Sequence, residues 1–273
     1  MVNEMLQQAP PARRIALGLE YLGTDYHGWQ RQRSLCSVQG SLEAALSQIA
    51  NHPVEVTCAG RTDRGVHASG QVVHFDTTAQ RREAAWISGC NTILPASVRV
   101  QWACPVAADF SARFSAVSRR YRYVVYNREI NSALFANLAT WHYRRLDAEK
   151  MQEAADYLLG EQDFTSLRST ECQASTPIKT IEFARLTRTG DFVILDIKAS
   201  GFLHHMVRNI MGVLLPIGEG KHPPARMAEV IAARNRSAAG VTALPNGLYL
   251  VEVGYPAKYN LPKRSIGPDI LRI

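Results

Sequence analysis

Two apolar runs separated by a four-residue turn sequence constrain the fold of this chain more than any other feature. Residues 181–187 and 192–199 are rich in β-branched and aromatic side chains, and Arg188-Thr189-Gly190-Asp191 lies between them. A short Gly-containing link of this kind is typical of a β-hairpin, whereas two parallel strands need a crossover of a dozen or more residues. The sequence therefore predicts antiparallel sheet in this part of the chain.

Strand and helix patterns alternate through both halves of the chain. Strands are predicted at residues 14–21, 54–58, 71–75, 98–103, 120–126 and 248–253, and helices at residues 38–49, 83–88, 147–159, 203–214 and 227–231. This order indicates an α+β fold of two domains, residues 1–110 and 111–273, each with a largely antiparallel sheet covered by helices. We expect a basic cleft where the two domains meet.

Composition excludes several classes of protein. Hydrophobic residues make up 46% of the 273 positions, and no apolar run approaches the roughly 18 residues of a membrane helix. Residues 1–12 are polar and lack the basic-then-apolar order of a secretory signal, so we expect a cytoplasmic protein. The five cysteines are widely spaced without a C-x-x-C pair, which predicts free thiols.

Positive charge is concentrated in one short segment. The formal net charge is +7, and residues 111–130 hold five arginines, Arg113, Arg119, Arg120, Arg122 and Arg128, against one acid, Glu129. Tyr121 and Tyr123 alternate with Arg120 and Arg122, so a strand there would present these two arginines on one face and these two tyrosines on the other. Aromatic platforms beside an arginine-rich face are typical of RNA binding, although a solvated basic strand would look the same.

Asp63 is the strongest candidate for a catalytic group. It stands in the segment GRTDRGVH at residues 60–67, between two predicted strands, with Arg61 and Arg64 on either side. One interpretation is a polar turn whose aspartate binds its own backbone. The other is a nucleophile, because a carboxylate beside arginines stays ionised. The residues alone leave both interpretations open.

Other catalytic patterns are missing or weak. The sequence has no phosphate-binding loop, no G-x-S-x-G and no H-E-x-x-H. His204 and His205 are the best metal candidates, but adjacent helical residues point about 100° apart and no third ligand lies at a recognisable spacing. We therefore favour packing or RNA contact for this pair. Arg208 follows in an apolar helix, where a charged residue needs a partner.

Several of these segments together resemble the TruA family of tRNA pseudouridine synthases. The matching segments are GRTDRGVH at 60–67, FSARFSA at 110–116, RRYRY at 119–123, DFTSLR at 163–168 and FLHHMVRN at 202–209. The resemblance implies two α+β domains, a homodimer, a tRNA partner and isomerisation of uridine at tRNA positions 38, 39 and 40 in the anticodon stem-loop. It implies neither a metal nor an organic cofactor.

The resemblance also implies residue roles. Asp63 matches the catalytic aspartate, Arg208 the arginine that pairs with it, Tyr121 the tyrosine that stacks on the flipped base, and Arg61 the arginine that fills the vacated place. The residues expected to contact RNA are Arg61, Arg81, Phe110, Arg113, Phe114, Arg119, Arg120 and Tyr121. A non-catalytic RNA-binding protein and a metal-dependent nuclease or deaminase are the alternatives; the second needs ligands that the sequence does not reveal.

Overall fold

The strands of the chain form one twisted sheet. The computed structural model describes residues 12–268. Residues 1–12 were expected not to form a secretory signal. Apart from Ala12, they lie outside the described residues. The strands are β1 (Arg13–Tyr21), β2 (Thr57–Cys58), β3 (His67–Thr77), β4 (Val98–Val106), β5 (Ser118–Asn127), β6 (Thr140–His142), β7 (Gly160–Asp163), β8 (Ile178–Thr189), β9 (Phe192–Ala199) and β10 (Leu248–Gly254).

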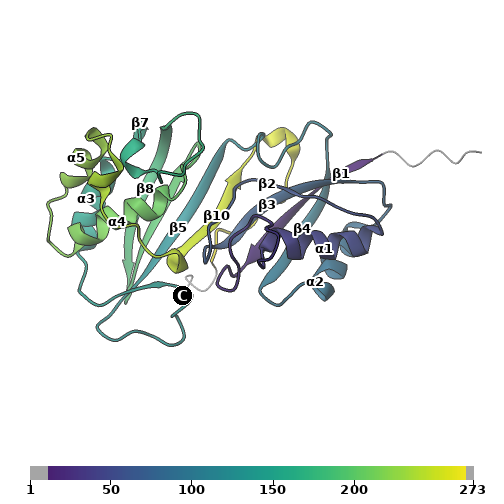
Figure 1. The fold of residues 1–273 in the computed structure, drawn as a ribbon, viewed down its shortest axis with the longest axis horizontal. Coiled ribbons are helices and arrows are strands. Elements are labelled where there is room, and N and C mark those ends of the chain that lie inside the picture. Colours follow the sequence, from purple (N-terminus) through teal and green to yellow (C-terminus); the bar gives the residue numbers. More distant parts are fainter. Residues whose placement is uncertain (1–11, 269–273) are drawn as a thin grey trace, which may run out of the picture.

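The last strand joins the two halves of the sheet. The strand order is β4-β1-β3-β10-β5-β9-β8-β7, so β10 lies between strands from the first and second halves of the chain (Figure 1). Most neighbours are antiparallel, including the predicted β8–β9 hairpin, but β10 pairs with β3 in parallel. The mixed, mainly antiparallel architecture is thus confirmed. Because the sheet continues across residue 110, the division into two domains with a basic cleft stays a prediction.

Helices cover one face of the sheet along its length. They are α1 (Val38–Ala50), α2 (Cys90–Ile93), α3 (Ala148–Asp156), α4 (Met206–Gly218) and α5 (Arg226–Ala232). The first two lie over the N-terminal strands, and the other three lie over the C-terminal strands (Figure 1). One continuous hydrophobic core includes residues of all five helices and of strands from both halves. None of the helices within residues 12–268 is long and apolar enough to cross a membrane.

Local sequence signals account for the ends of α1. Ser37 precedes the helix, and its hydroxyl accepts a hydrogen bond from the Gly40 N–H. Asn51 ends the helix in the left-handed conformation, with φ of 58°, which asparagine tolerates better than most residues. The helix predicted at 38–49 is therefore confirmed within one residue.

Other elements differ from the prediction where the local signal is weak. The helix expected at residues 83–88 is a π-helical turn at Ala85–Gly89 that leads into α2. The predicted strand 54–58 keeps only its last two residues, and the short strands β6 and β7 were not predicted. Strands of two to four residues are too short for a period-two pattern to stand out.

Two arginines of β5 form ion pairs on the sheet face opposite Tyr121. Asp196 on β9 receives two hydrogen bonds from Arg120, at 2.7 Å each, and one from Arg122 at 2.9 Å. Burial by itself raises the pKa of Asp196, but the bonds to both arginines outweigh it and the pKa is lowered. At pH values above the ordinary aspartate pKa, the ionised carboxylate therefore stabilises the fold. This stabilisation is lost as the pH falls through the lowered pKa of Asp196.

Asp196→Asn is expected to destabilise the sheet, because it removes the carboxylate that binds two partly buried guanidinium groups and leaves Arg120 with the more distant Glu252, at 3.8 Å. The expected cost is about 1–3 kcal/mol, below that of a fully buried pair. Urea unfolding at pH 7 measures it, and the difference from wild type should shrink at acidic pH. Asp109→Asn is the matched control, since Asp109 pairs with Lys258 at the surface and its loss should leave the midpoint almost unchanged. Equal effects of the two variants would contradict the role given to Asp196.

Candidate active site

The loop that carries Asp63 is held by the strands around it. Residues 59–66 connect β2 to β3, and the loop backbone is bonded at several points. The Gln71 side chain donates to the Gly60 carbonyl at 2.6 Å, and the Tyr21 hydroxyl lies 2.8 Å from the Thr62 hydroxyl. Both Tyr21 on β1 and Gln71 on β3 are buried. The loop is therefore fixed against these strands and is not a free turn.

A glycine from the N-terminal half allows this loop to pack closely. Gly28 has φ of 94°, and a Cβ there would lie 2.9 Å from the Thr62 carbonyl oxygen. The same oxygen accepts a hydrogen bond from the Trp29 N–H at 2.9 Å. Only a residue without a side chain fits this conformation without strain. The position of Asp63 thus depends on Gly28.

Three basic side chains surround the Asp63 carboxylate. Arg208 Nη1 donates to Asp63 Oδ2 at 3.4 Å, His205 Nε2 lies 3.3 Å from the same oxygen, and His204 Nε2 lies 3.3 Å from Oδ1. The Asp63 side chain is 24% exposed, so it is screened from water but still accessible. Arg208 therefore places a positive charge beside the carboxylate.

The start of α4 positions these basic groups. His205 precedes the helix with φ of 62°, a conformation that costs energy in a residue with a side chain and is common at functional sites. Burial lowers the pKa of His205, although the Asp63 charge opposes this effect, so the imidazole is neutral at pH 7. In the first turn, Arg208 also donates to the Ala243 carbonyl at 2.8 Å. Its guanidinium is therefore fixed from two sides.

Tyr121 lies on the helix-covered face of β5, next to the loop. Its side chain is buried, its ring packs edge-on against Phe202 with centroids 5.0 Å apart, and its hydroxyl lies 3.9 Å from where a Cβ on Gly60 would stand. Burial raises the pKa of Tyr121, and the nearby Asp63 charge raises it further. The phenol is therefore protonated at neutral pH and can donate a hydrogen bond, but it is a poor base.

A basic and aromatic loop extends from this centre. Arg119 donates to the carbonyls of Ala59 and Arg113 at 2.9 Å each, which ties the loop before β5 to the loop of Asp63. The Arg113 guanidinium lies 5.2 Å from the ring centroid of Phe114, and Phe114 is 81% exposed. Arg61 is also exposed. These groups form an accessible surface beside the carboxylate.

Three other residues that were expected to contact RNA lie elsewhere. The Phe110 ring is completely buried against Tyr255 and Tyr259, so core packing explains it and it offers RNA no surface here. Arg120 is held by Asp196 on the opposite sheet face. Arg81 follows the far end of β3 from Asp63, where it donates to the Ile49 carbonyl. RNA contact by Arg120 and Arg81 stays a prediction.

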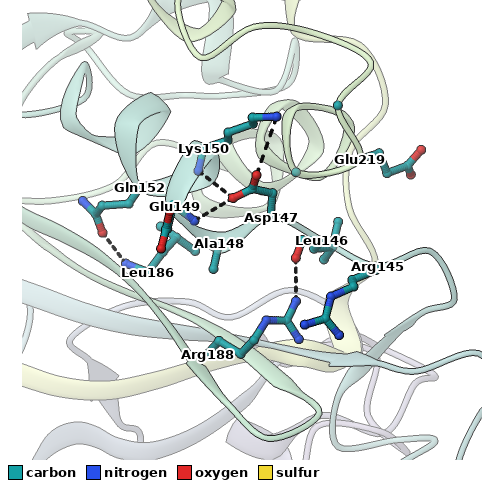
Figure 2. A pocket seen from close by; sticks show the side chains of 12 residues that line it. Arg145, Leu146, Asp147, Ala148, Glu149, Lys150, Gln152, Leu186, Arg188 and Glu219 are labelled. Carbon is teal, nitrogen blue, oxygen red and sulfur yellow. Dashed lines mark hydrogen bonds and ion pairs between the residues drawn. The ribbon is translucent and has the colours of Figure 1, made fainter.

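A separate pocket of about 810 Å³ lies between the start of α3 and the end of α4 (Figure 2). Arg145, Asp147, Lys150, Arg188 and Glu219 are among its lining residues. Asp147 is the N-cap of α3, and its carboxylate accepts hydrogen bonds from the N–H groups of residues 149 and 150. None of the residues that line this pocket was predicted as a site residue, and none belongs to the Asp63 centre.

Sequence reasoning missed the contact of His204 and His205 with Asp63. Their imidazole nitrogens and the carboxylate all lie within 4.8 Å of one another, so the third potential metal ligand comes from a distant segment. The sequence did contain a signal, because His204 and His205 precede Arg208 by four and three residues, and Arg208 was expected to reach Asp63. The contact was missed because a third metal ligand was looked for only at nearby positions in the sequence.

A family model described as tRNA pseudouridine synthase matches residues 19–115 and 154–256. The chain belongs to this family and is an isomerase. The alternative of a non-catalytic RNA-binding protein is therefore set aside.

Close relatives extend over nearly the whole chain. It is 53% identical over 265 residues to proteins named tRNA pseudouridine synthase A from Escherichia coli (strain SMS-3-5 / SECEC) and from Shigella dysenteriae serotype 1, covering 97% of this chain and 98% of each relative. A solved structure of a Cbf5-Nop10-Gar1 complex overlaps 87% of this chain and 49% of its own, at 10% identity and a TM-score of 0.34.

Gly28→Ala is expected to lower turnover by displacing the Asp63 loop. Gly160→Ala is the matched control, because Gly160 also has a positive φ, of 84°, but a Cβ there meets nothing within 4 Å. Each variant should lose about 1–2 kcal/mol of stability from the left-handed conformation. Only Gly28→Ala should also lose activity, by up to about 10²-fold if the carboxylate moves by 1 Å. Urea unfolding and tritium release from tRNA labelled at uridine C5 measure the two effects, and equal activities would contradict the loop contact.

Proposed function

We propose that the chain converts uridine to pseudouridine at positions 38, 39 and 40 of the tRNA anticodon stem-loop, with Asp63 as the catalytic carboxylate. The observation that carries this proposal is the convergence of Asp63, Tyr121 and Arg208 from three separate segments, with Arg208 Nη1 at 3.4 Å from Asp63 Oδ2. The positions in tRNA rest on the resemblance of the quoted sequence segments to the TruA family.

The reaction needs only one carboxylate and no redox partner. The bond between uracil N1 and ribose C1′ breaks, the base rotates, and C5 forms the new bond to C1′; C5 loses its hydrogen as a proton and N1 gains a proton, so the product is an isomer of the substrate. An ionised Asp63 has two chemical routes: attack on the electron-poor C1′, as in glycosidases, or removal of a ribose proton to give a glycal. Both routes use the charged form of the carboxylate, and the guanidinium of Arg208 lies beside it.

The target uridine must flip out of the RNA stack, and Tyr121 and Arg61 have separate roles in this step. Unstacking the target uridine costs on the order of a few kcal/mol. Tyr121 offsets part of this cost by stacking on the flipped base, a contact of about 1–3 kcal/mol. Arg61, exposed two residues before Asp63, fills the vacated place in the RNA. The ring of Tyr121 serves as the stacking platform. Its hydroxyl can donate a hydrogen bond, because the phenol is protonated.

The surface around Asp63 supports approach of the RNA backbone. Arg113 and Phe114 are exposed beside the carboxylate, and Arg119 fixes their loop against the loop of Asp63. Arginine contacts to phosphate and an exposed ring for stacking match the chemistry of an unpaired RNA loop. By the resemblance to the TruA family, we propose that the enzyme is a homodimer. Action on tRNA agrees with the cytoplasmic location that we expect from the sequence.

Asp63→Asn is expected to abolish turnover while leaving the fold intact. Loss of the Asp63 carboxylate should reduce tritium release from tRNA labelled at uridine C5 by at least about 10³-fold, as for other essential catalytic groups. Asp109→Asn, which changes an exposed carboxylate outside the site, should keep normal turnover. Circular dichroism and tRNA binding check that the Asp63 variant is folded. Normal tritium release by Asp63→Asn would overturn the assignment.

Substrate position is tested with transcripts that carry tritiated uridine at one site only. We expect release from transcripts labelled at position 38, 39 or 40, and none from transcripts labelled elsewhere in the anticodon arm or in other arms. Wild-type protein and Asp63→Asn are compared on each transcript. Release confined to another position would refute the proposed site while leaving the role of Asp63 intact.

A further inference from the structure

Two imidazoles at the catalytic centre have no role in the proposed reaction. His204 and His205 point their Nε2 atoms at different oxygens of Asp63, each at 3.3 Å, and their rings lie side by side with centroids 3.9 Å apart. The side chains are 36% and 27% exposed, against 24% for Asp63. All three donors therefore face a place that solvent reaches.

The spacing of these donors is that of a metal coordination sphere. Zn²⁺ binds nitrogen and carboxylate oxygen at about 2.0–2.2 Å, so neighbouring ligand atoms of a tetrahedral site lie about 3.3 Å apart. His204 Nε2 lies at this distance from Asp63 Oδ1, the oxygen that Arg208 leaves free, and one ligand atom from each of the three residues lies within 4.8 Å of the others. Small side-chain rotations are enough to bring them onto one ion.

The types of donor atom select the kind of ion. Two imidazoles with one carboxylate suit Zn²⁺ and neighbouring transition metals, whereas Mg²⁺ and Ca²⁺ prefer oxygen ligands alone. Three protein ligands leave a fourth position open for water.

Arg208 fits such a site as an outer partner. Its Nη1 contacts Asp63 Oδ2, and its Nε is held by the Ala243 carbonyl. One carboxylate oxygen can then bind the ion while the other stays with Arg208, in the way that outer groups orient metal-binding carboxylates. The guanidinium charge repels a cation, so we expect reversible binding rather than the tight hold of a structural zinc site.

We propose that Asp63, His204 and His205 form a binding site for a divalent transition-metal cation, with Zn²⁺ preferred, and that the bound ion inhibits the enzyme by occupying the Asp63 carboxylate. The metal site stands on the donor geometry alone. Its inhibitory effect rests on the proposed catalytic role of Asp63.

Binding of Co²⁺ alone tests the site without any activity measurement. Untagged full-length protein carrying Cys36→Ser, which removes an exposed thiol, is titrated with Co²⁺ while the visible absorption is followed. We expect one Co²⁺ per chain with the intense spectrum of four-coordinate cobalt, and displacement by Zn²⁺, which binds such ligands more tightly. A weak six-coordinate spectrum, or no saturable binding, would overturn the proposal.

Variants assign the ligands. His204→Ala, His205→Ala and Asp63→Asn should each weaken Co²⁺ binding by more than the roughly 10- to 100-fold that loss of an outer-shell partner costs. His222→Ala, which removes an exposed histidine outside the site, should bind as the parent does. Circular dichroism verifies that each variant folds. If a histidine variant does not fold, Asp63→Asn still tests the site, because asparagine has nearly the same shape as aspartate. Unchanged binding in the folded ligand variants would mean that the histidines only hydrogen-bond to Asp63.

Tritium release in the presence of Zn²⁺ tests the inhibition separately. We expect added Zn²⁺ to stop release by the parent protein and a chelator to restore it, with His222→Ala equally sensitive. One saturable Co²⁺ per chain at the three ligands without inhibition would refute only the second half of the proposal. Normal release by metal-free Asp63→Asn would instead refute the proposed function and leave the metal site standing.

Discussion

The pairing of β10 with strands from both halves of the chain is the constraint on which the rest of the structure depends. Without it, β4-β1-β3 and β5-β9-β8-β7 would be two separate sheets. In parallel with β3, β10 pairs Tyr249 and Leu250 with His67 and Ala68, the first residues after the Asp63 loop. On its other edge, Leu250 pairs with Tyr121. The same strand thus sets the distance between the Asp63 loop and Tyr121.

Secondary structure was largely predictable because local periodicity determines it. The hairpin around Gly190, α1 with its Ser37 cap, and the long strands all follow from residue spacing and turn residues. The central position of β10 was not predictable in this way. Its parallel ladder with β3 contains only two residue pairs, which are far apart in the sequence and carry no local signal.

The candidate site shows the same division between local and distant information. The residues around Asp63 were compatible with a polar turn or with a catalytic group. The resemblance of several segments, in the same order, to the TruA family favoured the catalytic interpretation. His204 and His205 were considered only with neighbours in the sequence, so their contact with Asp63 was missed. For Arg120 and Arg122, counting charge along the sequence overstated the charge available to RNA, because Asp196 on a distant strand already binds both.

The late place of β10 in the chain also affects how the protein is made. A ribosome synthesises β3 and β5 long before residue 248, so the edge of β3 next to the Asp63 loop has no strand partner for most of translation. Open edges of this kind invite pairing with other chains. The same order means that Asp63 and Tyr121 are joined through β10 only after residues 248–254 have been made. A nascent chain that lacks these residues therefore holds the Asp63 loop and β5 without the strand that connects them.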